Sequence, residues 1–185
     1  MTSCDRIEPS SALAAVLTRT GVGAFLLALA ACGGASSKRG ADTARSGSGR
    51  SVRMRMTAMD GGEIDLARYR GRVVVIHLFD TDNAAAQLDV EQLKALSRGE
   101  PKRVTVVGIC LDPEGYPMAA AWRRALGVRY LVALDRSAVD GRSPLGKLHV
   151  VPTTLLLDRS GALVQRIERP LQPGELAELV SDLLE

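Results

Sequence analysis

The strongest constraint in this chain is a buried-strand pattern that leads directly into a helical one. Residues 73–79, Val-Val-Val-Ile-His-Leu-Phe, are almost continuously apolar and rich in β-branched side chains. Such a run is typical of a strand that is covered on both faces, as in a parallel sheet. In the residues that follow, apolar side chains recur at spacings of three and four, which indicates an amphipathic helix. Its inward positions are Ala86, Val90, Leu93 and Leu96.

The start of this helix is also predicted by the sequence. Asp82 and Asn83 are both suitable N-caps, because a side-chain oxygen there accepts a hydrogen bond from a free amide of the first helical turn. The polar positions of the helix are expected to face solvent; they are Gln87, Asp89, Glu91, Gln92 and Lys94.

The rest of the chain alternates strand and helix patterns. Because strand, helix and strand follow one another from residue 73 to residue 111, a right-handed crossover and parallel pairing are favoured. The expected strands are 51–59, 73–79, 104–111, 128–134, a strand within 150–157, and 162–167. The further helices are 118–126 and 173–184, turns occupy 60–62 and 158–161, and 135–147 is expected to be a loop with one helical turn.

Two segments carry a resemblance to a known family. Residues 71–86 resemble the strand, loop and helix of TlpA/ResA-type proteins, which are redoxin-like, where Gly-Lys-Val-Val-Val-Val-Asn-Phe-Trp-Ala-Thr-Trp-Cys-x-x-Cys would be expected. Residues 150–161, Val-Val-Pro-Thr-Thr-Leu-Leu-Leu-Asp-Arg-Ser-Gly, resemble the family's Gly-Val-Pro-Thr-Thr-Phe-Leu-Ile-Asp-Arg-x-Gly. The resemblance implies an α/β thioredoxin-like fold over residues 52–185. It would have a central mixed sheet of about five strands flanked by helices and an N-terminal strand or hairpin extension. It also implies that Pro152 is cis.

The catalytic pair of that family is missing. Asn83 and Ala86 fall where its two cysteines belong. Thiol–disulfide exchange needs an attacking thiolate and a second sulfur within bonding reach, and neither residue supplies one. The sequence therefore predicts a redox-inactive binding or assembly module that presents Asp82, Asn83, Val151 and Pro152 to an extended peptide. A purely structural envelope protein is a further alternative.

Two other residues are weak catalytic candidates. His77 lies six positions before Asn83, where thioredoxin keeps a buried carboxylate. It is interpreted as a neutral imidazole hydrogen-bonded within the sheet, with a ligand-sensing or proton-accepting role as the alternative. Cys110 ends a predicted strand and is interpreted as a small buried apolar residue. The alternative for Cys110 is a one-cysteine thiol–disulfide oxidoreductase or peroxidase that works with a partner.

No motif for a metal or a cofactor accompanies these residues. His149 lies near Pro152, but no metal-ligand spacing connects it to His77 or to the aspartates at 80 and 82. The sequence therefore predicts neither a metal nor a cofactor.

The N-terminal part of the chain reads as a leader and a linker. Residues 21–32 form an apolar run that is too short to span a bilayer but suits the core of a signal peptide. The run ends in Leu-Ala-Ala-Cys32, which resembles a bacterial lipobox with acylation of Cys32. We therefore expect a lipoprotein signal peptide over 1–31, a flexible basic tether over 32–51, and the thioredoxin-like domain over 52–185. An ordinary secretory signal and an uncleaved anchor are the alternatives.

The charge distribution helps to define the expected partners. Residues 33–55 hold six Lys or Arg side chains against one Asp, so the rest of the chain is slightly acidic although the whole carries +3. The folded domain thus has no nucleic-acid-binding signature. The expected partners are an extracytoplasmic protein or peptide client and a membrane, reached through lipid on Cys32. The expected location is the bacterial cell envelope, facing the periplasm or the exterior.

Overall fold

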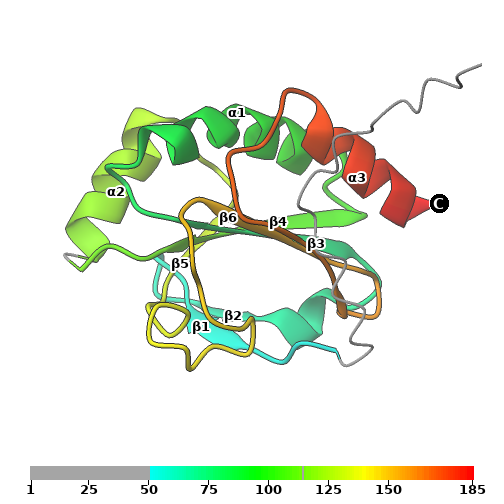
Figure 1. Cartoon of the computed structure of the whole chain (residues 1–185), viewed down its shortest axis with the longest axis horizontal. Coiled ribbons are helices and arrows are strands. Elements are labelled where there is room, and N and C mark those ends of the chain that lie inside the picture. Colours follow the sequence, from blue (N-terminus) through cyan, green and yellow to red (C-terminus); the bar gives the residue numbers. More distant parts are fainter. Residues whose placement is uncertain (1–50, 114) are drawn as a thin grey trace, which may run out of the picture. The chain divides into compact units, whose positions relative to one another are not determined.

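The structure is a computed structural model that describes residues 51–113 and 115–185. Its centre is a five-stranded mixed sheet of order β5-β4-β3-β6-β7 (Figure 1). The parallel strands β3, β4 and β5 lie side by side, and β6 runs antiparallel to both β3 and β7. The predicted thioredoxin-like architecture is thereby confirmed. The strands are β3 (Val73–Phe79), β4 (Val104–Cys110), β5 (Leu131–Leu134), β6 (Thr153–Leu157) and β7 (Leu163–Ile167).

The central strand β3 divides its side chains between two apolar layers. Val73, Val75 and Phe79 pack under the helices α1 (Ala84–Gly99), α2 (Tyr116–Ala125) and α3 (Glu175–Leu184). In Figure 1 these three helices all lie on the same side of the sheet. The alternate residues of β3 point to the opposite layer; they are Val74, Ile76 and Leu78.

An N-terminal extension covers that opposite layer. It consists of the antiparallel pair β1 (Arg55–Thr57) and β2 (Glu63–Asp65), followed by the short 3-10 helix η1 (Leu66–Tyr69). The alternation predicted for residues 51–59 is confirmed, because Val52, Met54, Met56 and Ala58 are all buried. Only three residues of that stretch form regular strand. Ser51 and Ala58 instead make isolated bridges, to Ala162 and Ala133 respectively.

One polar position of α1 was predicted wrongly. Asp89 is 1% exposed instead of facing solvent. The loop between β7 and α3 covers it, and the amide of Leu171 donates to its Oδ1 at 2.9 Å. Smaller differences are that β5 begins at Leu131 instead of residue 128, and that residues 135–147 form turns without a helix.

The predicted leader (1–31), the acylation site Cys32 and nearly all of the tether (32–51) lie outside the described residues. Within the described part of the chain, no helix combines the length and apolar character needed to cross a membrane.

Candidate functional site

The candidate site lies at the edge of the sheet where β3 and β4 end and β6 begins, here called the carboxyl edge. The chain leaves β3 at Phe79, turns, and enters α1 after Asn83. The amide of Ala86 donates to Asn83 Oδ1 at 3.1 Å, so Asn83 and not Asp82 is the N-cap. The first turn of a helix favours negative charge, which in a dithiol protein would stabilise a thiolate. In this protein the first turn of α1 is capped by the neutral side-chain amide of Asn83.

The side chain of Asn83 also reaches the proline loop. Its Nδ2 donates to the carbonyl oxygen of Val151 at 3.1 Å. The Val151–Pro152 peptide bond is cis, as the resemblance implied. The sequence predicted that Asn83, Val151 and Pro152 share one groove. It gave no sign of the hydrogen bond between Asn83 and Val151, which lie 68 positions apart. Asn83 therefore connects the start of α1 to the loop before β6.

The second motif position is filled by an apolar group. Ala86 is fully buried and belongs to the apolar layer beneath the helices. Its Cβ methyl group can neither donate nor accept a proton or an electron pair. The position that supplies the second sulfur in the family motif therefore supplies none here.

His77 lies in β3 and faces the helix-covered side of the sheet, as Val75 and Phe79 do. Its Nδ1 is 3.1 Å from the Oγ1 of Thr154, its cross-strand neighbour on β6, while Nε2 has no protein partner within the described residues. Burial lowers the pKa of His77 to about 4, although the backbone of Ala86 opposes this shift. The imidazole is therefore neutral at neutral pH, in agreement with the favoured interpretation.

Cys110 is the one cysteine within the described residues, and it is a free thiol. It is 1% exposed, and its Sγ donates to Asp112 Oδ2 at 2.9 Å. Burial, followed by the hydrogen bond to Asp112, raises the pKa of this thiol to about 12. A reactive cysteine needs a populated thiolate and access to solvent, and Cys110 has neither.

A polar cleft of about 550 Å³ opens beside the proline loop. Asp80 and Asp82 come from the end of β3, whereas His149 and Val150 come from the loop that leads to Pro152. Burial raises the pKa of Asp80, the neighbouring Asp112 and Asp82 add to that shift, and Arg136 opposes it. His149 lines the same cleft as Val151.

Sequence reasoning missed two residues of the cleft. Asp112 accepts from the amide of Thr81 with both carboxylate oxygens, at 3.0 and 3.3 Å, and Arg136 donates to the carbonyl of Leu111. Both follow the carboxyl ends of parallel strands, which is the signal that could have found them. Within residues 51–113 and 115–185, no three His, Cys, Asp or Glu side chains are grouped so as to hold a metal ion.

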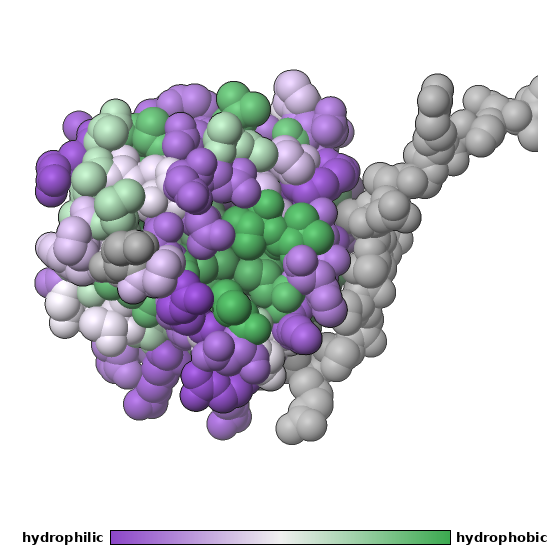
Figure 2. Space-filling model, turned by 60° about the vertical axis from the view of Figure 1, so that its left-hand side comes forward, coloured by the Kyte–Doolittle hydropathy of each residue, from purple (hydrophilic) through white to green (hydrophobic). Residues whose placement is uncertain are grey.

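Apolar side chains are exposed near this cleft. Val139 and Val150, which both line the cleft, are 40% and 44% exposed. Figure 2 shows the side of the molecule that lies on the left in Figure 1, where an apolar area is bordered by hydrophilic side chains. Such a mixed surface is suited to contact with another chain.

Comparison with known proteins identifies the class. The family model described as Redoxin matches residues 41–183, and the chain belongs to this family. No curated protein matches the sequence significantly.

Solved structures share the fold at low sequence identity. A DsbF homologue from Corynebacterium diphtheriae is 19% identical with a TM-score of 0.65, covering 72% of this chain and 85% of its own. A thiol:disulfide interchange protein of the thioredoxin family from Chlorobium tepidum TLS is 18% identical with a TM-score of 0.64, covering 73% and 95%. A secreted Mycobacterium tuberculosis disulfide oxidoreductase homologous to E. coli DsbE is 16% identical with a TM-score of 0.61, covering 71% and 96%. These likenesses establish the thioredoxin fold.

Proposed function

We propose that this redoxin-family protein is a redox-inactive binding module, which holds an extended segment of a client protein at the carboxyl edge of its sheet. The observation that carries the proposal is the pair of hydrogen bonds made by Asn83, to Ala86 in α1 and to Val151 beside the cis proline. An amide at this position keeps the two walls of the site together without a sulfur. Function belongs to the site and not to the fold, so the family alone does not make the chain an oxidoreductase.

The rival function is a thiol–disulfide oxidoreductase or peroxidase that uses Cys110. Such an enzyme would have to expose a thiol that is 1% accessible and deprotonate it beside the carboxylate of Asp112. Both requirements oppose the local chemistry, because a neighbouring negative charge disfavours a thiolate. Cys110 also has no second cysteine within the described residues to resolve a mixed disulfide.

The cleft indicates what kind of client segment would fit. The amide N–H of Val151 has no acceptor within the described part of the chain, so it is free to pair with the backbone of an added strand. Val139 and Val150 line the cleft and offer apolar contact. Asp80 and Asp82 line the same cleft, which favours a client segment that carries Lys or Arg.

We further propose that the domain is attached to a membrane outside the cytoplasm through lipid on Cys32. The apolar run that ends in Leu-Ala-Ala-Cys32 supports this, as does the polar segment between Cys32 and the first described residue. A structural neighbour from Mycobacterium tuberculosis is described as secreted, which is compatible with such a location.

Two measurements test the binding function. Reduction of a disulfide substrate by the wild type and by Cys110→Ser should not exceed the background of free thiols, and turnover above it would overturn the proposal. A photo-crosslinking residue at Val150 should trap a discrete client in cells, whereas the same residue at exposed Ser181 on α3 should not. Equal yields from both positions would indicate that the carboxyl edge does not bind a client.

A further inference from the structure

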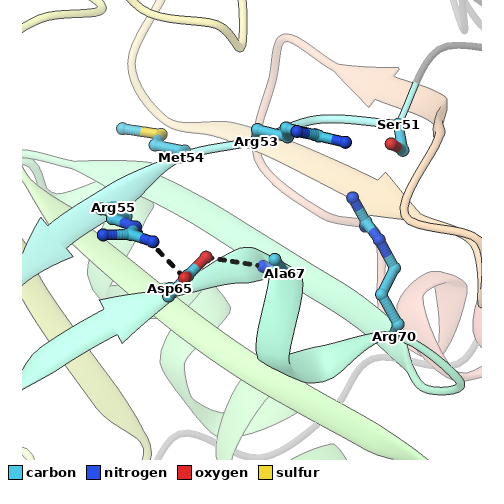
Figure 3. Close-up of a pocket in the computed structure, with 7 residues that line it drawn as sticks. All are labelled: Ser51, Arg53, Met54, Arg55, Asp65, Ala67 and Arg70. Atoms are coloured by element: carbon cyan, nitrogen blue, oxygen red, sulfur yellow. Dashed lines mark hydrogen bonds and ion pairs between the residues drawn. The ribbon is translucent and has the colours of Figure 1, made fainter.

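A second pocket lies near the opposite edge of the sheet, where β3 and β4 begin and β6 ends, here called the amino edge. It has a volume of about 430 Å³. Figure 3 shows the side chains around it, which come from the N-terminal extension and from the segment that precedes β3. The lining residues are Ser51, Arg53, Met54, Arg55, Asp65, Ala67 and Arg70.

The three arginines of the pocket differ in their partners. Arg55 is paired with Asp65, with Nε and Oδ2 3.2 Å apart. Neither Arg53 nor Arg70 has a carboxylate within ion-pair distance in the described part of the chain. The charge of Arg55 is therefore neutralised by Asp65, whereas the charges of Arg53 and Arg70 have no counter-charge among the described residues.

The unpaired groups gather at one opening. Arg70 Nη2 donates to the carbonyl oxygen of Val52 at 2.9 Å, which places its guanidinium beside the backbone between Ser51 and Arg53. In Figure 3 the guanidinium groups of Arg53 and Arg70 and the hydroxyl of Ser51 point toward one another. The two like charges repel each other, and an anion bound between the two guanidinium groups would be attracted to both.

The position of Arg70 depends on a glycine. Gly161 has φ +75°, and a Cβ built there would lie 1.1 Å from Arg70 Nη1. Gly161 itself is held in place, because its carbonyl accepts from the amide of Val52 at 2.8 Å and the next residue, Ala162, bridges to Ser51. The guanidinium thus occupies space that any side chain at position 161 would fill.

We propose that Ser51, Arg53 and Arg70 form a binding site for a phosphate group, with an anionic phospholipid head group as its source. Guanidinium groups donate paired N–H bonds that match phosphate oxygens, and a serine hydroxyl can complete the set. A carboxylate would meet the same donors with fewer oxygens.

The lipid source, but not the site itself, rests on the proposed anchor at Cys32. Ser51 follows directly on the basic segment that holds Lys38, Arg39, Arg45 and Arg50. If the segment between Cys32 and Ser51 is flexible, as the sequence predicts, its length corresponds to a mean extension of about 25 Å, and an anchored domain would stay within reach of head groups. Strand β3 separates the two edges by about 20 Å, so a membrane at the amino edge leaves the cleft at Asp80 and Val150 free.

The test uses the full chain with Cys32→Ser, so that its result does not depend on acylation. Three soluble probes are titrated: inorganic phosphate, monomeric dihexanoylphosphatidylglycerol and monomeric dihexanoylphosphatidylcholine. Binding is followed by NMR at the Gly161 and Ala162 amides. The phosphatidylglycerol probe should bind about tenfold more tightly than the phosphatidylcholine probe, whose choline cation the arginines repel.

Paired variants separate the pocket from general charge. Arg53→Gln with Arg70→Gln should weaken phosphatidylglycerol binding by about tenfold or more, whereas Arg98→Gln with Arg124→Gln, two exposed arginines on helices, should change it less than about twofold. Arg53→Gln alone serves if the double variant does not fold, because Arg53 makes no hydrogen bond within the described residues.

Each outcome decides between the possibilities. Loss of phosphatidylglycerol binding with the pocket pair alone supports the site and its lipid source. Inorganic phosphate binding at least as tightly as phosphatidylglycerol supports the site with free phosphate as its source. No amide shift with any probe, or an equal loss with the control pair, overturns the site while leaving client binding at Val150 untouched.

Discussion

The two ends of β3 differ in how their polar groups are satisfied. At the carboxyl edge, Asn83 uses both its oxygen and its nitrogen within the protein, and the nearest thiol, Cys110, is bonded to Asp112. At the amino edge, Arg53 and Arg70 have no acidic partner in the described part of the chain. The edge where the family keeps its chemistry thus lacks a reactive sulfur but carries the acidic side chains of Asp80 and Asp82, whereas the other edge carries arginines without a counter-charge in that part of the chain. A fold shows where chemistry can be placed, and the unsatisfied groups show where binding energy remains available.

The largest expected effect comes from restoring the sulfurs. Asn83→Cys combined with Ala86→Cys places a thiol at the N-terminus of α1 and a second thiol one turn later, so a low-pKa thiolate with a resolving partner becomes possible. We expect disulfide reduction to rise at least about a hundredfold above wild type, measured by insulin turbidity.

Asn83→Cys alone is the matched control, and it should form mixed disulfides without sustained turnover. If the double variant is folded but inert, the carboxyl edge differs from a redox site by more than two sulfurs. The neutral His77 would then be the first residue to replace by mutation.

The next largest effect concerns pH and the groups buried beneath the carboxyl edge. The pKa of His77 is about 4 in the folded state against 6.5 when unfolded, so the unfolded chain binds more protons in this range. Stability from His77 is therefore lost as the pH falls from 6.5 to 4, by about 3 kcal/mol in total.

Asp89 acts in the opposite direction. Burial raises its folded pKa to about 6 from 3.8, so its contribution to stability increases as the pH falls through 6. In the wild type the two contributions largely cancel. Urea unfolding at pH 7 and pH 4 should show Asp89→Asn losing about 3 kcal/mol more than wild type on acidification. His77→Gln should lose less unfolding free energy than wild type on the same acidification. Identical pH profiles for all three proteins would contradict this account.

A smaller effect is expected from removing the bridge at the carboxyl edge. Asn83→Ala deletes the N-cap of α1 and the bond to Val151, and should lower the free energy of unfolding by about 2 kcal/mol. Asp82→Ala, at the exposed neighbouring position, should change it by less than about 0.5 kcal/mol. Thermal or urea unfolding of the two variants gives the comparison. Equal effects would mean that neither the N-cap bond nor the bond to Val151 contributes to stability.

The smallest effects on stability are expected at the amino edge. Arg70→Gln should destabilise by about 1 kcal/mol because the bond to the Val52 carbonyl is lost. Arg53→Gln should stay within about 0.5 kcal/mol, since its side chain bonds to nothing else in the described residues. A large loss from Arg53→Gln in calorimetry would show that this arginine has a structural role and not a binding role.

Local patterns predicted those features that depend on neighbouring residues. The run from Val73 to Phe79 was confirmed residue for residue, because a β-branched run covered on both faces suits little else. Side-chain chemistry limited the N-cap of α1 to Asp82 or Asn83, and the structure shows that it is Asn83.

Features that depend on distant segments could not be found this way. Asp89 was misplaced because the loop at Leu171 covers it, and no pattern along α1 reports a loop about eighty positions away. The contact between Arg70 and Gly161 joins two turns that come together only when β6 pairs with β3. From the sequence, Gly161 was predicted to lie in a turn, and no contact with Arg70 was predicted.

The bridge made by Asn83 sets how a bound client would leave. A protein held through a mixed disulfide is released when a resolving or reducing thiol attacks that bond, so its departure follows the redox state of the compartment. An amide that joins α1 to the Val151 carbonyl offers no such trigger. Departure would then follow only the off-rate of the complex, and a change in oxidising conditions would leave the occupancy of this protein unaltered.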